Sequence, residues 1–277
     1  MIRRILAEAS AAGESVISVL PGAPAELSQA RVLAKTQHRP WAVPEGPWLM
    51  AQTWRDLLFA HWPVPPDLVR QVLPPALAVD TFAGSAWIGI TPFEVTGLRP
   101  RGTPPLPGVS SFPELNVRTY TTVADKPGIY FLSLDAASRL AVIAARRAYR
   151  LPYFHARMTI ERRPPAVDYR SDRTSGDGPA AGFEATYRPV GDVFHAEPGT
   201  LDHFVAERYC LYTVNDTGQP LRGEIHHPPW PLQAAQAMIT VNTMTLPWGI
   251  ELPSEEPLLH FSRLQNVVIW PLRPVSP

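Results

Sequence analysis

Lysine is nearly missing from this chain of 277 residues: only Lys35 and Lys126 stand among its 25 basic residues. Any chemistry that needs a lysine amine is therefore confined to these two positions. The formal net charge is zero, so the chain lacks the long-range field that attracts nucleic acid or an anionic membrane surface. We expect neither a nucleic-acid partner nor a membrane partner.

Cysteine and long apolar runs are also scarce. Cys210 is the single cysteine, so an internal disulfide and a zinc site built from several thiolates are both excluded. No apolar run approaches the roughly 18 residues that a membrane-spanning helix needs. Glu8 and Glu14 interrupt the N-terminal stretch that could mimic a signal peptide. Together these features predict a cytoplasmic protein.

Several motifs of catalysis and cofactor binding are absent. The chain has no G-x-S-x-G elbow and no glycine-rich phosphate loop. His226 and His227 are adjacent, so on a strand they point to opposite faces and cannot easily share an ion. We therefore expect no metal and no cofactor.

Proline is abundant, and its 33 copies confine helices to the few windows that lack it. The predicted helices are Asp67–Leu73, Ala136–Tyr149, Leu201–Arg208 and Leu232–Val241. Asp135 is placed to cap the second of these helices and Thr200 the third.

The rest of the chain has the pattern of strands joined by turns. For example, residues 119–123 and 129–134 flank a turn that we place at Pro127–Gly128, with glycine in the positive-φ position. Successive hairpins with about four short helices predict a mainly β fold, an antiparallel barrel that is closed or nearly so. Residues 1–45 lack periodicity and are expected to be a flexible extension, with 46–277 forming a single domain.

One predicted strand places polar side chains on a single face. Glu114, Asn116 and Arg118 recur at period two, while Leu115 and Val117 point the other way. This face is either a solvated exterior or the interior of a barrel that holds a small polar ligand. A glutamate beside an arginine suits a general base near a carboxylate anchor, but it suits a structural ion pair equally well.

A second alternation follows the helix predicted to end near Tyr149. Tyr153, His155 and Arg157 share one face of the next strand. The same two interpretations apply, and a slip of one residue in register would exchange the two faces.

From Trp54 onward, ordered blocks of sequence resemble the YqjF-like family of uncharacterised conserved bacterial proteins. They are WRDLLFAHWPV (54–64), VDTFAGSAWIGITPF (79–93), FPELNVRTY (112–120), FLSLDA (131–136), LPYFHARM (151–158), ERYCLY (207–212), HHPPWPLQ (226–233) and HFSRLQNVVIW (260–270).

That family is similar in fold to acetoacetate decarboxylase, which implies a cone-shaped antiparallel β-barrel around a pocket. The resemblance places Glu114 where that enzyme has a buried glutamate. The enzyme's Schiff-base lysine follows a proline, and here Pro152 is followed by Tyr153, which has no amine. Lys126 falls at a hairpin tip and Lys35 in the extension, so neither replaces it. We therefore expect no Schiff-base chemistry.

Three hypotheses of function remain. In the first, Glu114 moves protons without a covalent intermediate, Arg118 or Arg157 holds a carboxylate, and Tyr153 donates a hydrogen bond during enolisation, hydration or dehydration of an oxo acid. In the second, the same pocket, with Asn116 and His155, binds a small ligand without turnover, as a monomer or a homo-oligomer. In the third, exposed aromatic surface docks a partner protein, through Trp41, Trp48, Trp54 and Trp62.

Overall fold

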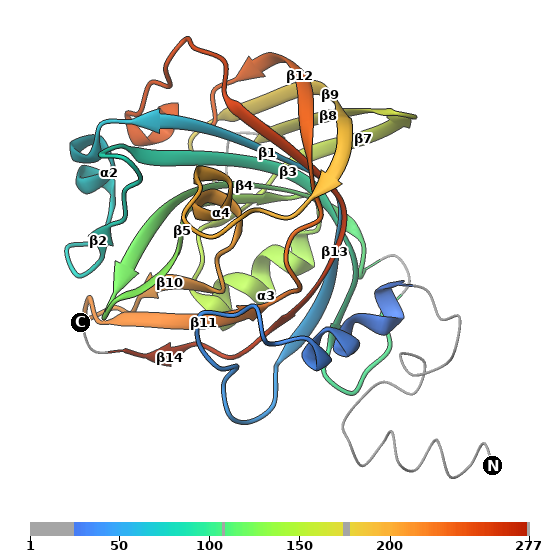
Figure 1. The fold of residues 1–277 in the computed structure, drawn as a ribbon, viewed down its shortest axis with the longest axis vertical. Coiled ribbons are helices and arrows are strands. Elements are labelled where there is room, and N and C mark those ends of the chain that lie inside the picture. Colours follow the sequence, from blue (N-terminus) through green and yellow to red (C-terminus); the bar gives the residue numbers. More distant parts are fainter. Residues whose placement is uncertain (1–24, 107–108, 174–177, 276–277) are drawn as a thin grey trace.

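The structure, a computed structural model, describes residues 25–106, 109–173 and 178–275. Its strands join one 14-stranded sheet that curls around helix α3 (Arg139–Tyr149) (Figure 1). In chain order the strands are β1 (Met50–Val64), β2 (Ala78–Val79), β3 (Ala86–Pro100), β4 (Phe112–Val123), β5 (Lys126–Ala136), β6 (Tyr153–His155), β7 (Arg157–Arg163), β8 (Ala166–Arg173), β9 (Ala181–Phe194), β10 (Cys210–Val214), β11 (Pro220–His226), β12 (Leu232–Asn242), β13 (Leu258–Ile269) and β14 (Arg273–Pro274).

Part of this sheet closes into a ring. Strands β11, β10, β5, β4, β3, β1 and β13 are hydrogen-bonded in that order, and β11 also pairs with β13 through Ile225 opposite Ile269. Strands β12, β9, β8 and β7 continue from β13 and fold back over the outer face of the ring, where Phe183 joins Ile90 and Leu115 in one core. The predicted mainly β barrel is confirmed.

Two pairings depart from the antiparallel pattern. Strand β5 pairs in parallel with β10 and with β6, whereas the other ring pairings are antiparallel. Long connections that contain α3 or α4 (Leu201–Ala206) separate β5 from these partners, and such crossovers permit parallel pairing where a tight hairpin does not.

The other helices are α2 (Pro66–Val72) and two short 3-10 segments, η2 (Ala25–Ala34) and η3 (Leu246–Trp248). Thr200 caps α4 as predicted, because its side-chain oxygen accepts from the amide of His203. Among the described residues, no helix combines the length and the apolar character required to span a membrane.

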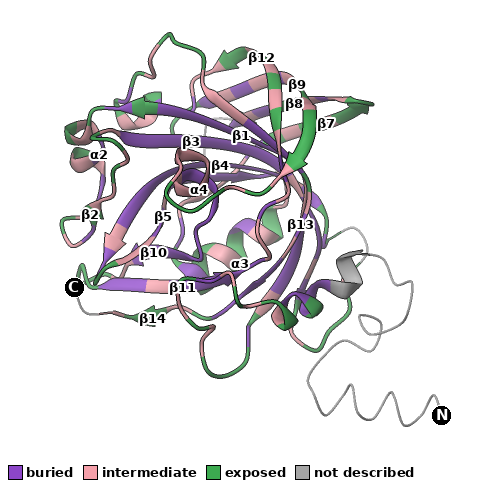
Figure 2. Ribbon diagram, in the orientation of Figure 1, coloured by how far each residue is buried: buried purple, intermediate pink, exposed green. Residues whose placement is uncertain are grey.

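The helix predicted over Leu232–Val241 is wrong, since this window is β12, paired with β9. Its first residue is buried, and the next eight alternate between half-buried and exposed, as on a strand with one covered face. Figure 2 shows this alternation in the outer layer, in contrast to the mostly buried β1 and β3. A lack of proline permits a helix but does not require one, and strand pairing decided the outcome.

The predicted cap of α3 is also different. Ser138 caps this helix by accepting from the amide of Ala141 at 3.3 Å. Asp135 instead lies at the end of β5, where its carboxylate accepts from Arg173 at 2.5–3.1 Å, with both side chains fully buried. The helix starts later than expected because β5 continues through Ala136.

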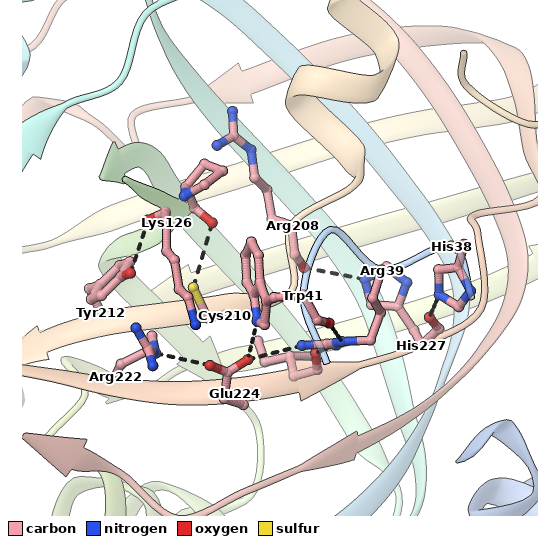
Figure 3. Close-up of polar contacts among 12 residues, drawn as sticks. His38, Arg39, Trp41, Lys126, Arg208, Cys210, Tyr212, Arg222, Glu224 and His227 are labelled. Carbon is pink, nitrogen blue, oxygen red and sulfur yellow. Dashed lines mark hydrogen bonds and ion pairs between the residues drawn. The ribbon is translucent and has the colours of Figure 1, made fainter. Parts of the chain in front are cut away.

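Residues 25–45, expected in a flexible extension, pack on the barrel; residues 1–24 lie outside the described part. Ala30 and Val32 are buried beside β13. The Arg39 guanidinium donates to Glu224 of β11 at 2.9 Å and to the Ile225 carbonyl at 2.6 Å (Figure 3). The sequence did not predict this contact, because Arg39 stands in a stretch without a periodic pattern of apolar residues.

Candidate functional site

A cavity of about 310 Å³ lies inside the ring, between the strands and α3. Every strand of the ring contributes to its wall, which makes this space the interior of the barrel. One lining residue from each strand is Trp54 of β1, Leu98 of β3, Glu114 of β4, Phe131 of β5, Leu211 of β10, Ile225 of β11 and Ile269 of β13.

Strand β4 aims its polar side chains at this interior. Glu114 and Asn116 line the cavity, while Leu115 and Val117 point to the outer core and are fully buried there. The alternation read from the sequence therefore separates two environments, and the predicted polar face is the inner one.

Glu114 is held away from water. Only 5% of the residue is exposed, and burial raises the pKa of its carboxyl from 4.5 to about 8, although hydrogen bonds from Tyr153 and Asn116 lower it. The Tyr153 hydroxyl lies 3.2 and 3.3 Å from the two carboxyl oxygens. Near neutral pH, both the acid and the carboxylate form of Glu114 are therefore accessible.

Asn116 leaves one polar atom without a partner in the cavity wall. The residue is 7% exposed, and its Oδ1 has no hydrogen-bond partner although it is buried. A buried acceptor of this kind costs free energy until a donor reaches it. The site therefore offers an acceptor, Asn116 Oδ1, beside a carboxyl group that can donate when it is protonated.

Tyr153 reaches Glu114 from the short strand β6, which pairs with β5 so that Tyr153 lies opposite Leu134. Burial and the neighbouring Glu114 raise the pKa of the Tyr153 hydroxyl well above 10, so the phenol stays neutral and acts as a donor. Tyr153 thus contributes a hydrogen bond to Glu114 from a neutral phenol.

The predicted arginines do not line the cavity. Arg118 lies farther along the inner face of β4, where its guanidinium donates to the Val205 carbonyl at 2.9 Å and lies 5.1 Å from the Phe59 ring centre. Arg157 is exposed on β7, outside the ring. His155 is half-buried in β6 and also lies outside the cavity lining.

Neither lysine reaches the cavity. Lys126 lies beside the ring of Trp41, 5.2 Å from its centre, in the group of polar contacts around Glu224 and outside the cavity lining (Figure 3). Lys35 is exposed. Among the described residues, the lining contains no lysine and no arginine. In the same part of the chain, no group of three or more histidine, cysteine, aspartate or glutamate residues is arranged to hold a metal ion.

Other wall residues were not predicted as parts of a site. Gln52 accepts from the Trp54 indole at 2.8 Å, and Tyr149 donates to the Trp270 carbonyl at 3.3 Å. The lining face of α3 consists of small side chains, Ala141, Ala144, Ala145 and Ala148. Their spacing of three and four residues marks one helix face, which is the one signal that could have identified them.

A ring of strands that curls around helix α3 has the fold of acetoacetate decarboxylase-like proteins. Acetoacetate decarboxylase from Legionella pneumophila has a similar structure, with a TM-score of 0.57 and 12% identity over 87% of this chain and 93% of that chain. An acetoacetate decarboxylase-like enzyme from Sphingomonas wittichii has a TM-score of 0.56 and 13% identity over 87% and 98% of the two chains. At this identity, the likeness establishes the fold.

The chain belongs to the DUF2071 family of uncharacterized conserved proteins, which it matches over residues 51–266. The "Uncharacterized protein YqjF" of Bacillus subtilis is 49% identical to it over 237 residues, which cover 86% of this chain and 97% of that protein. The family resemblance read from the sequence is confirmed.

Proposed function

We propose that the barrel binds a small neutral oxo compound and that Glu114 exchanges a proton with it, interconverting its keto and enol forms without a covalent intermediate. The observation that carries this proposal is the grouping of Glu114, Tyr153 and Asn116 in one wall of an otherwise mainly apolar cavity. Such a cavity with a few convergent polar groups is the usual form of a small-molecule site.

The protonation behaviour of Glu114 suits this chemistry. A general acid or base works best when its pKa lies near the working pH, and that of Glu114 is about 8. The carboxylate takes a proton from the carbon beside the carbonyl, and the electron pair of that C–H bond forms the C=C bond. Glu114 then returns the same proton to the ligand oxygen, so the enol forms with no net change in protons.

Asn116 favours the enol over the ketone. Its buried Oδ1 requires a donor, which the O–H group of an enol supplies and a ketone oxygen does not. An interaction lowers the barrier when it is stronger in the transition state than in the ground state, and this one strengthens as the ligand oxygen gains the proton. Tyr153 holds the Glu114 carboxylate in place during the transfer.

The ligand head is proposed to be neutral because no lysine or arginine of the described residues lines the cavity. We expected Arg118 or Arg157 to anchor a carboxylate, but Arg118 is engaged by the Val205 carbonyl and Arg157 is exposed outside the ring. A buried carboxylate beside Glu114 would then lack a compensating charge, which is costly in an apolar cavity.

A second candidate is binding without turnover, as in a carrier or sensor. The mainly apolar lining favours it, because apolar contacts hold a ligand without promoting any reaction.

Deuterium exchange into 2-hexanone in heavy water, followed by proton NMR, separates the two functions. Wild type and Arg157→Met are expected to accelerate exchange at the carbons beside the carbonyl, and Glu114→Gln is expected to fall to the uncatalysed rate. Thermal shifts with the same ketone report binding. If all three proteins bind and none accelerates exchange, the barrel is a binding protein; if Glu114→Gln exchanges as fast as wild type, the role of Glu114 is refuted.

A further inference from the structure

The cavity has a polar end and an apolar end along the barrel. Register places Glu114 opposite Phe93 and Asn116 opposite Thr91 of β3. Both polar residues are buried, so this end of the cavity lies away from the protein surface.

The other end opens to solvent. Farther along β3, Pro100 is opposite Met50, which in turn is opposite Ile269 of β13, and these three residues line the cavity. Pro100 is exposed, and the neighbouring Leu49 is 39% exposed. The mouth is therefore mainly apolar. Glu114 and Asn116 lie at the buried end, and the amide of Gln52, near Met50 on β1, is engaged by Trp54 and Met50.

Helix α3 forms the wall between the two ends. All four of its lining alanines face the cavity: Ala141 and Ala145 are half-buried, and Ala144 and Ala148 are exposed and lie nearer to solvent. Each of these side chains ends at Cβ, which leaves the cavity open along the helix. A larger side chain on this face would occupy the space that a ligand needs.

We infer that the ligand is a molecule with one neutral polar head and a single aliphatic tail, that the tail runs along the alanine face of α3 toward the mouth, and that Ala145 limits its length. This inference rests on the proposed function, which places the oxo head at Glu114 and Asn116. It adds the class of ligand and a residue that sets specificity.

The cavity volume bounds the length of this ligand. A volume of about 310 Å³ equals about ten water-sized volumes of ~30 Å³ each, so it accommodates about ten non-hydrogen atoms. A methyl ketone of about nine carbons fills it. Each added methylene should raise the affinity about fourfold until the cavity is full, because burying a methylene group is favourable by about 0.8 kcal/mol.

The test measures dissociation constants for methyl ketones from 2-butanone to 2-undecanone by calorimetry. In wild type the affinity should rise about fourfold per carbon and level off at about nine carbons. Ala145→Leu should end the rise about three carbons earlier, because leucine adds three carbons to the wall. Ile143→Leu, on the exposed side of the same helix, should match wild type.

Two results would overturn the inference. One is an affinity that does not change with the length of the ketone, and the other is an affinity that levels off at the same ketone length in Ala145→Leu as in wild type. If Ala145→Leu does not fold, Ala148→Leu at the exposed mouth provides the same comparison. Glu114-dependent exchange in 2-butanone without any dependence on chain length would leave the proposed function standing and remove only this inference. If wild type binds none of these ketones, both fail.

Discussion

The hydroxyl of Tyr153 and the carboxyl of Glu114 face each other inside the barrel, 3.2 and 3.3 Å apart for the two carboxyl oxygens. They come from strands β6 and β4, which both flank β5. The barrel therefore joins a neutral donor to a buried acid.

The pH dependence of stability should change in Glu114→Gln. The pKa of Glu114 is about 8 in the folded protein against an ordinary value of 4.5, so the folded state retains a proton that the unfolded chain has released. The free energy of unfolding therefore falls as the pH rises from about 4.5 to about 8. Glutamine stays neutral, so the variant should lack this loss. Its free energy of unfolding should exceed that of wild type by on the order of 4 kcal/mol at about pH 9. Urea denaturation at about pH 5, 7 and 9 measures the difference; equal pH slopes in the two proteins would contradict the burial of a titrating Glu114.

Tyr153→Phe should raise the pKa of Glu114 above about 8, because the hydrogen bond from Tyr153, which this variant lacks, stabilises the carboxylate form. A pH titration of carboxyl-labelled glutamate by carbon-13 NMR, with Glu114→Gln to assign the signal, measures this directly. Tyr130→Phe, in β5 and outside the cavity lining, is the matched control and should leave the Glu114 titration as in wild type. An unchanged pKa in Tyr153→Phe would mean that the two side chains do not interact.

Asp135 and Arg173 form a buried ion pair, and we expect the loss of one partner to destabilise the protein more than the loss of both. Asp135→Asn leaves an uncompensated guanidinium with no exposed surface and should destabilise the protein by about 3–5 kcal/mol. The double variant Asp135→Leu with Arg173→Met removes both charges and should cost less than the single variant. Denaturant midpoints decide between these outcomes, and a double variant that is worse than the single one would count against the account.

Arg39 should anchor residues 25–45 to the barrel. Its side chain has no exposed surface in the ion pair with Glu224, so Arg39→Met should destabilise the protein by on the order of 3 kcal/mol and speed tryptic cleavage at Lys35. Arg163→Met removes a largely exposed arginine that pairs with Glu161 and should leave both measurements unchanged. Equal cleavage rates in the two variants would show that Arg39 does not hold this segment.

Borohydride reduction in the presence of acetoacetate should leave the mass of the protein unchanged. The two lysines of the chain lie outside the cavity, so neither side-chain amine meets a bound keto group there. Intact-mass spectrometry of wild type tests this, and Lys126→Arg with Lys35→Arg controls for surface labelling. A reduced adduct on Lys126 that depends on Glu114 would overturn the noncovalent proposal.

Local patterns in the sequence predicted many elements but not all of their limits. The β4–β5 hairpin forms as expected, yet its turn falls at Ala124 and Asp125, which both take positive φ, and not at Pro127–Gly128. Gly128 has another role, because a Cβ there would lie 2.7 Å from Cys210 Sγ. A glycine needed for close packing and a glycine needed for a turn are not distinguishable in one sequence.

The sequence alone determined which side chains share a face, because strand alternation is a property of the backbone; this put Glu114 and Asn116 together. It also determined that no amine stands after Pro152. Only the tertiary structure decided what covers each face. Helix α3, with its alanines, leaves a cavity over Glu114, whereas Val205 at the end of α4 engages Arg118 on the same strand, and the strand that carries Arg157 lies outside the ring. These outcomes depend on contacts between residues far apart in the chain, which local periodicity does not encode.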